Sequence, residues 1–145
     1  MTPTTLSEMI ADRPIHTVSE DETVRLACVA MTSRSVGALP VVDKHDRLVG
    51  MISERDVIRR SVIVYRPSED TPVSTIMTRN PVFLPPDATP GDALDAMQKG
   101  GFRHLPVCAD GQVMGIVSIR DFDLREGGNG AVLRKTHDRT SDQEG

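Results

Sequence analysis

Leu48-Val49-Gly50-Met51-Ile52-Ser53-Glu54-Arg55-Asp56 is the stretch of sequence that decides the fold. Its apolar run leads into Ser-x-x-Asp, a pattern that predicts a buried strand running into a helix that begins at Ser53. The same design returns 65 residues later as Val113-Met114-Gly115-Ile116-Val117-Ser118-Ile119-Arg120-Asp121. The chain therefore contains two copies of one strand-to-helix junction.

The duplication extends upstream of both junctions. Each copy has an apolar lead-in segment, a helical pattern opened by Asp-x-Thr and a Leu-Pro-Val strand, in the same order. The matching segments are Leu6-x-x-Met9-Ile10 with Val73-x-x-Ile76-Met77, Asp21-x-Thr23 with Asp87-x-Thr89, and Leu39-Pro40-Val41 with Leu105-Pro106-Val107. Because an internal repeat fixes the architecture, the sequence predicts an α/β (α+β) fold of two β-α-β-β-α units.

Helix signals place the elements within each unit. Thr89, Pro90 and Asp92 form a helix start, and Gly100-Gly101 is typical of a helix end. The extended pieces are expected at Ile15–Val18 and Val82–Leu84, the strands at Ala38–Val42, Leu48–Ile52, Leu105–Cys108 and Val113–Val117, and the last helices from Ser53 to near Arg60 and from Ser118 to near Arg125.

The expected domain boundaries follow from these elements. A lead-in helix takes residues 1–13, the first unit 14–62, a linker with the second lead-in helix 63–79, the second unit 80–126, and a polar tail that we expect to be disordered 127–145. The apolar residues of Leu6–Ile10 could pack on either unit or across a dimer.

Composition narrows the class of protein. The chain has 145 residues and a formal net charge of −4, which argues against nucleic acid as the main partner. It has neither an apolar run long enough to span a membrane nor a secretory signal at the N-terminus, so we expect a cytoplasmic location. Cys28 and Cys108 lack metal-ligand spacing and are expected to be small core residues. His137, in the polar tail, is expected to be solvated.

The paired Gly-x-h-Ser-x-x-Asp motifs (h apolar), each with its Leu-Pro-Val strand, closely resemble a tandem cystathionine-β-synthase (CBS) domain pair, or Bateman module. The resemblance covers about residues 6–126. It implies two units related by a pseudo-twofold axis, with clefts between them that bind adenosine-containing ligands such as AMP, ADP, ATP, NAD or S-adenosylmethionine. It also implies a homodimer that regulates a partner protein without doing chemistry. No cofactor is required, and AMP or ATP is the regulatory ligand that we expect.

The Ser-x-x-Asp motif has two interpretations. It is a capping box, in which the Ser and the Asp satisfy backbone N–H groups at the helix start. The same geometry suits a nucleotide, because a helix start and the hydroxyl of Ser53 or Ser118 can bind phosphate. Within the resemblance, Asp56 and Asp121 accept hydrogen bonds from the ribose hydroxyls.

Neighbouring residues predict that the two clefts differ. Arg55 and Arg120 suit phosphate through their forked donors, although a solvated helix face explains them equally well. Arg103-His104 stands where the first copy has Gly37-Ala38. The second cleft is therefore expected to favour a phosphorylated ligand and the first a neutral moiety or no ligand, unless these are a surface Arg and a packed His.

An apolar adenine slot completes the expected site. By the family pattern, it lies between the first extended piece and the Leu-Pro-Val strand of each copy. The full set of candidate nucleotide-binding residues is Thr17, Val18, Ala38, Pro40, Ile52, Ser53, Arg55, Asp56, Phe83, Leu84, Arg103, His104, Pro106, Val117, Ser118, Arg120 and Asp121.

Two other functions fit the sequence less well. A ligand-free dimeric interaction module would use both motifs only as helix caps. An enzyme, such as a nucleotide hydrolase, is disfavoured because the sequence has no P-loop, no nucleophile–base motif and no metal-ligand cluster. No catalytic residue and no metal ligand is assigned.

Overall fold

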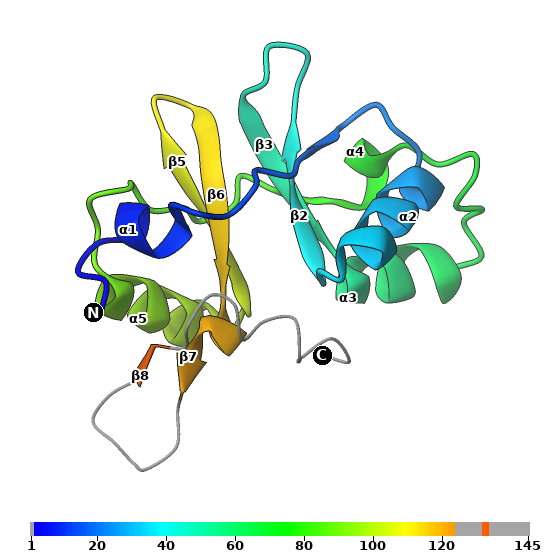
Figure 1. Cartoon of the computed structure of the whole chain (residues 1–145). Coiled ribbons are helices and arrows are strands. Elements are labelled where there is room, and N and C mark those ends of the chain that lie inside the picture. Colours follow the sequence, from blue (N-terminus) through cyan, green and yellow to red (C-terminus); the bar gives the residue numbers. More distant parts are fainter. Residues whose placement is uncertain (1, 124–131, 134–145) are drawn as a thin grey trace. The chain divides into compact units, whose positions relative to one another are not determined.

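The computed structural model describes residues 2–123 and 132–133 of the chain. These residues form two compact units, drawn in Figure 1. The first-repeat unit contains His16–Pro81 with Asp110–Val113, and the second-repeat unit contains the described residues of Met1–Ile15, Val82–Ala109 and Met114–Gly145. The predicted mixed α+β fold is confirmed.

The first-repeat unit is built on a four-stranded sheet with the order β1-β2-β3-β4. The β1 strand runs parallel to β2, the other neighbours are antiparallel, and Ala38 pairs with Ser53. The helices α2, α3 and α4 lie on one side of this sheet (Figure 1). The elements are β1 (Val18–Ser19), α2 (Val24–Arg34), β2 (Ala38–Val42), β3 (Leu48–Ser53), α3 (Glu54–Val57), which continues as the π-helix η1 (Ile58–Val62), α4 (Val73–Ile76) and β4 (Thr78–Arg79).

The second-repeat unit pairs β5 with β6, and both α1 and α5 lie on one side of this pair (Figure 1). Leu84 forms an isolated parallel bridge to Val107, in place of a full first strand. The elements are α1 (Leu6–Ile10), α5 (Pro90–Gly100), β5 (His104–Ala109), β6 (Gln112–Ser118), the 3-10 turn η2 (Ile119–Asp121), and β7 (Phe122–Asp123), which pairs with β8 (Val132–Leu133).

The helix signals seen in the sequence act as predicted. The hydroxyl of Thr89 accepts the N–H of Asp92 at 3.0 Å, the carboxylate of Asp92 accepts the N–H of Thr89 at 3.0 Å, and Pro90 occupies the first turn of α5. Gly101 ends this helix with a φ of 72°. The matching helix α2 ends at Ser35, which takes the same left-handed conformation with a φ of 56° although it has a side chain.

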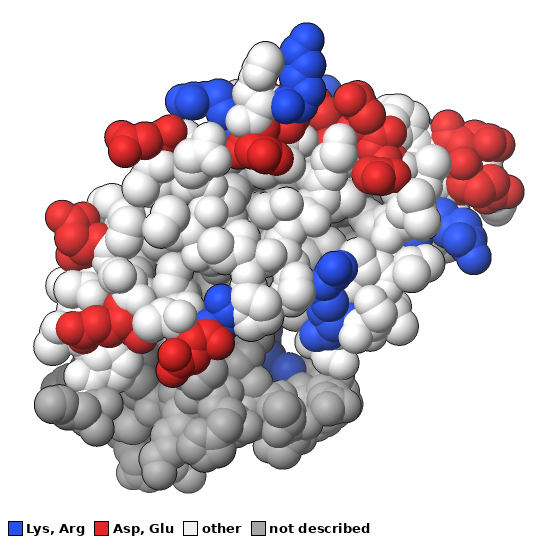
Figure 2. Space-filling model, turned by 45° about the horizontal axis from the view of Figure 1, so that its top comes forward, with Lys and Arg blue, Asp and Glu red and all other residues white. Residues whose placement is uncertain are grey.

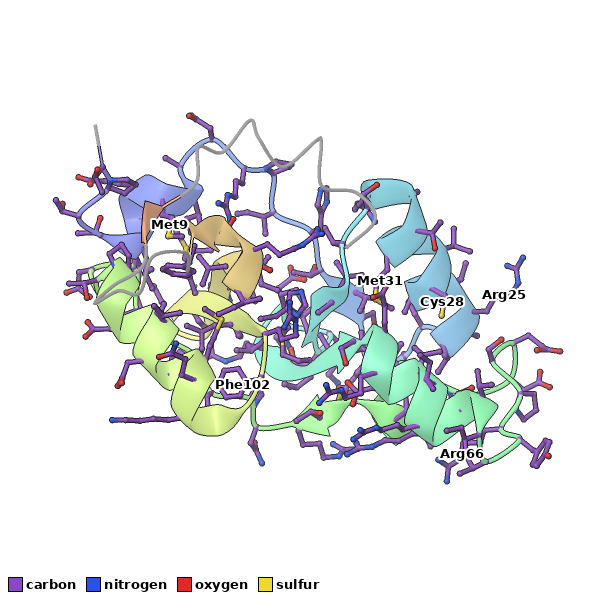
Figure 3. The ribbon with its side chains drawn as sticks, turned by 90° about the horizontal axis from the view of Figure 1, so that it is seen from below. Met9, Arg25, Cys28, Met31, Arg66 and Phe102 are labelled. Atoms are coloured by element: carbon purple, nitrogen blue, oxygen red, sulfur yellow. The ribbon has the colours of Figure 1, made fainter. Side chains whose placement is uncertain are left out.

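Each lead-in helix completes the core of the unit that contains the other repeat. Leu6, Met9 and Ile10 of α1 are buried with Ala93, Met97 and Leu105 of the second-repeat unit. Val73, Ile76 and Met77 are buried with Val24, Met31 and Ile52 of the first-repeat unit. Figure 3 shows Met9 and Met31 inside their respective units, whereas Arg25 points away from α2. This answers where α1 packs, a question that the sequence left open.

The expected last helix of the second repeat is wrong. After Ser118 the chain makes only the three-residue turn η2, and Phe122 is extended with φ −114° and ψ 143°. Phe122 belongs to the buried core, whereas the matching Val57 of the first repeat stays helical and half-buried. Burying the larger apolar side chain favours the extended path. Arg125, His137 and the tail at 127–145 lie outside the described residues.

Smaller differences concern the edges of the elements. The extended piece expected at Val82–Leu84 of the second unit contains no strand at Val82 and Phe83. The first-repeat sheet has a fourth strand that the sequence did not predict, β4 at Thr78–Arg79. The helix after Ser53 runs on to Val62 rather than ending near Arg60. Neither cysteine is in a disulfide within the described residues; Cys108 is buried, and Cys28 is half-buried against the core.

Candidate functional site

The first junction is a complete capping box. The hydroxyl oxygen of Ser53 accepts the N–H of Asp56 at 3.2 Å, and Oδ2 of Asp56 accepts the N–H of Ser53 at 3.0 Å. The Ser53 hydroxyl also donates to Oδ2 of Asp56 at 3.1 Å. The structural interpretation of the motif is therefore correct here, and a bound phosphate would have to take the hydroxyl from Asp56.

The carboxylate of Asp56 keeps capacity for a ligand. Its second oxygen, Oδ1, has one hydrogen-bond partner among the described residues, the hydroxyl of Thr78, at the long distance of 3.4 Å. Asp56 is half-buried rather than closed off from solvent. A carboxylate oxygen has two lone pairs, so Oδ1 can accept hydrogen bonds from the hydroxyls of a sugar.

The second junction forms the same capping box, but here the carboxylate of the aspartate is enclosed by other groups. The hydroxyl oxygen of Ser118 accepts the N–H of Arg120 at 3.2 Å, and Oδ2 of Asp121 accepts the N–H of Ser118 at 2.8 Å. The guanidinium of Arg13 donates hydrogen bonds to both carboxylate oxygens of Asp121, with Nη2–Oδ1 at 2.9 Å and Nη1–Oδ2 at 3.1 Å. Asp121 is only 2% exposed.

Arg13 was missed by sequence reasoning. It follows α1 and lies 108 residues before Asp121, so no spacing rule links them. The only local signal is its place in the lead-in segment, where the matching residue of the other copy is Asn80. Nη1 of Arg13 also donates to the carbonyl of Ile116 in β6 at 3.1 Å, which fixes the guanidinium against the end of that strand.

The start of each last helix is tied to the strand beside it. The N–H of Glu54 donates to the carbonyl of Gly37 at 3.0 Å, and the N–H of Ile119 donates to the carbonyl of Arg103 at 2.8 Å. Gly37 and Arg103 therefore occupy matching places, as the sequence predicted. The side chains of Arg55 and Arg103 are exposed, whereas those of Arg120 and His104 are half-buried.

The candidate adenine-slot residues divide into core and surface. Leu84 lies beside Pro106, because its N–H donates to the carbonyl of Pro106 at 3.2 Å. Thr17 and Phe83 are exposed. The side chains that are buried, and so pack as ordinary core, are those of Val18, Ala38, Pro40, Ile52, Pro106 and Val117.

Comparison with known proteins identifies the family. A family model described as CBS domain matches residues 6–63 and 73–123. The chain belongs to the CBS domain family. It is 39% identical over 103 residues to the CBS domain-containing protein CBSCBSPB5 of Arabidopsis thaliana, an alignment that covers 71% of this chain. The chain spans only about a fifth, 19%, of the length of that relative.

Two solved structures of CBS proteins carry adenosine compounds. The CBS domain protein PAE2072 of Pyrobaculum aerophilum, complexed with AMP, is 26% identical with a TM-score of 0.72, and the match covers 80% of this chain and 88% of that one. The CBS domain pair of protein MJ0100, in complex with 5′-methylthioadenosine and S-adenosylmethionine, is 27% identical with a TM-score of 0.72, covering 81% and 92%. Each of these two CBS proteins thus holds an adenosine-containing compound in its solved structure.

Surface charge and metal-ligand chemistry add two observations. On the face drawn in Figure 2, the described acidic and basic side chains are interspersed rather than gathered into a patch of one sign. Among the described residues, no group of three or more His, Cys, Asp or Glu side chains could hold a metal ion, and no helix is long and apolar enough to cross a membrane.

Proposed function

We propose that this CBS pair is a sensor that binds an adenosine-containing ligand and passes the signal to a partner protein by a change of conformation. The observation that carries the proposal is the accessible carboxylate of Asp56 at a strand-to-helix junction. It accepts hydrogen bonds from Ser53 and one long hydrogen bond from the Thr78 hydroxyl. The two CBS structures with AMP and with S-adenosylmethionine support the ligand class. AMP and ATP are the leading candidates.

The chemistry of the site explains how such a ligand would be held. Oδ1 of Asp56 accepts from the ribose hydroxyls, and hydrogen bonds to a charged acceptor contribute about 1.5–3 kcal/mol each. The Ser53 hydroxyl turns from Asp56 to a phosphate oxygen, and the exposed Arg55 side chain is free to swing to the same group. A ligand shifts the conformation only through different affinities for the two states.

The experiment is a thermal-shift screen with AMP, ADP, ATP, NAD and S-adenosylmethionine, followed by calorimetric titration of the best ligand. At a ligand concentration one hundred times the Kd, binding adds about 2.7 kcal/mol to stability. We expect Asp56→Asn to lose binding. Asp92→Asn is the matched control, because Asp92 forms the same capping box in α5, away from the junction. Equal affinities of Asp56→Asn and the wild type would rule out the site.

A homodimer is the second part of the proposal. Within the first-repeat unit, α2 and the helix formed by α3 and η1 lie side by side in Figures 1 and 3. Large apolar side chains are exposed on these two helices, and on the residue that follows the second one: Leu26, Val29, Ile58, Val62 and, after the helix, Ile63. We call these five residues the apolar helix face. An exposed cluster of this kind is typical of a protein interface, and a second copy of the chain is the partner that we propose for it.

The alternative function, a ligand-free dimeric interaction module, is favoured by the same apolar helix face. It predicts a stable dimer by light scattering, and no change of melting temperature with any of the five adenosine compounds. A selective shift with one of them, lost in Asp56→Asn, would decide for the sensor.

A further inference from the structure

The carboxylates of the two motif aspartates differ in burial and in the groups that already donate hydrogen bonds to them. Asp56 is half-buried, and within the described part of the chain its Oδ1 accepts only the long hydrogen bond from the Thr78 hydroxyl. Asp121 is 2% exposed, and its two oxygens accept at least three N–H groups, two from Arg13 and one from Ser118. The residues that the family motif makes equivalent are therefore chemically different in this chain.

The Arg13–Asp121 pair is built as a closed unit. Its geometry is the two-pronged, parallel arrangement that is strongest for Arg and a carboxylate. The Arg13 side chain is 13% exposed, and its Nη1 is shared between Asp121 and the carbonyl of Ile116. Its Nε is buried and has no hydrogen-bond partner among the described residues, so the carboxylate is what compensates this buried cation.

A sugar at Asp121 would have to displace the guanidinium. Two charge-assisted hydrogen bonds would then be exchanged for two from neutral hydroxyls, and the buried Arg13 would be left without its counter-ion. Removing one partner of a buried ion pair is strongly unfavourable, because the remaining charge is uncompensated. The exchange therefore opposes binding at the second junction.

The backbone gives a second, independent difference. The helix after Ser53 runs through α3 and η1 from Glu54 to Val62, whereas the helix after Ser118 is only the three-residue turn η2. Phe122 then enters the core in an extended conformation. The aligned N–H groups that favour phosphate at a helix start belong to helices of several turns, so the second junction lacks this contribution too.

We infer that the chain binds one adenosine ligand, with its ribose on Asp56, and that Asp121 serves instead as the anchor that fastens the N-terminal lead-in segment through Arg13. The inference rests on the proposed function for its ligand and on the Arg13–Asp121 geometry for its anchor. α1 supplies Leu6, Met9 and Ile10 to the core of the second-repeat unit, and the ion pair locks the end of that segment in place.

The ligand half is tested by calorimetric titration of the full chain with AMP. We expect one AMP per chain in the wild type. Asp56→Asn should weaken binding at least a hundredfold, and Arg13→Gln should leave the affinity of the Asp56 site unchanged within about threefold. Two AMP molecules per chain, or retained affinity in Asp56→Asn, would overturn the single-site assignment.

The anchor half is tested without any ligand. Because breaking a buried pair costs about 3–5 kcal/mol, Arg13→Gln and Asp121→Asn should each lower the folding equilibrium constant about 10²-fold or more, and the double variant should lose little further. Arg13→Lys keeps the positive charge but cannot form the two parallel hydrogen bonds to Asp121. It serves as the milder variant if Asp121→Asn does not fold. Additive losses in the double variant, or an unchanged melting temperature in Arg13→Lys, would overturn the anchor.

The two failures can be told apart. If the wild type binds none of the five adenosine compounds, the proposed function and the single-site assignment fail together, while strong coupling of Arg13 and Asp121 still establishes the anchor. If AMP binds twice per chain, the sensor stands and the closed second junction is refuted.

Discussion

Gly50 and Met77 lie so close together that no side chain fits between them. A Cβ at position 50 would come within 2.6 Å of Sδ of Met77 and within 2.9 Å of the carbonyl oxygen of Thr78. At the second junction, a Cβ on Gly115 would meet Cδ1 of Ile10 at 2.8 Å. The glycine of each motif is thus explained by packing, because the lead-in helix segment of the same unit lies directly against it.

Replacing Gly50 by alanine should destabilise the chain by about 1–3 kcal/mol, the usual cost of overpacking a core. The carbonyl oxygen of Thr78 belongs to the backbone of β4 and cannot move aside as a side chain would. Urea denaturation followed by circular dichroism measures the loss. Gly115→Ala should cost less, because the nearest atom is the flexible end of Ile10.

Gly91→Ala is the matched control for this prediction. Gly91 lies in the first turn of α5, and a Cβ there would meet nothing closer than 3.8 Å. Alanine suits a helix better than glycine by roughly 0.5–1 kcal/mol, so this variant should be as stable as the wild type or more so. Equal destabilisation in Gly50→Ala and Gly91→Ala would contradict the packing argument.

The two long helices make a second prediction, because they end in the same conformation with different residues. Ser35 has a φ of 56° and Gly101 a φ of 72°. A side chain in the left-handed region costs roughly 1–2 kcal/mol. Ser35→Gly should therefore raise the stability by up to about 1 kcal/mol, and Gly101→Ser should lower it by a similar amount.

Ser33→Gly controls for the general effect of glycine. Ser33 is an exposed residue two positions earlier, inside α2, where glycine is unfavourable in a helix by up to about 1 kcal/mol. Chemical denaturation of the three variants gives the comparison. Opposite signs for Ser35→Gly and Ser33→Gly are expected, and equal signs would show that the αL conformation carries no strain.

The repeat made most of the fold predictable, because each pattern was seen twice and local signals decided its elements. Both cores, the capped α5 and the strands β2, β3, β5 and β6 follow from periodicity and capping. Three features did not follow, since each depends on tertiary contact. Arg13 binds Asp121, which lies 108 residues later in the chain. The helix α1 packs in the core of the unit that contains the other repeat. Phe122 is buried in an extended conformation where the matching residue of the first repeat is helical.

The candidate site was predictable to the same extent. The capping geometry of Ser53 and Asp56 follows directly from Ser-x-x-Asp, because it is a local hydrogen-bond pattern. The closure of Asp121 does not, because sequence identity of two motifs says nothing about which distant side chain packs on each. Ligand binding by any of these residues stays a prediction.

Cys28 provides a prediction for pH dependence. Burial raises the pKa of its thiol, and the nearby carboxylate of Glu54 raises it further. The thiolate fraction is therefore small at pH 8, and alkylation by iodoacetamide should be slow. Because the folded-state pKa is raised, this group contributes stability below the ordinary thiol pKa and loses it as the pH rises through the folded value. Glu54→Gln should speed alkylation in a Cys108→Ala background, which leaves one thiol to follow.

Asp70→Asn is the control for this experiment, because Asp70 is an exposed acid that does not contribute to the raised pKa of the Cys28 thiol. This variant changes the net charge by the same amount as Glu54→Gln. Equal rates of Cys28 alkylation in the two variants would therefore assign the faster alkylation to overall charge. A bell-shaped or flat rate between pH 7 and 10, in place of a continuing rise, would contradict a raised pKa.

The apolar helix face gives the last prediction. Val62 and Ile63 are 63% and 62% exposed. Val62 is the last residue of η1, the helix that also presents Ile58, and Ile63 follows it. Large apolar side chains held this far in water favour association, at about 25 cal/mol per Å² of apolar surface removed from solvent. Charges introduced at Val29 and Ile58 would have to be desolvated in the interface, so Val29→Glu/Ile58→Glu should convert a dimer into a monomer by light scattering. Met114→Glu, an exposed apolar residue of β6 outside this face, should leave the dimer intact. A monomeric wild type, or a dimer that survives both charges, would show that another surface or no surface joins two copies.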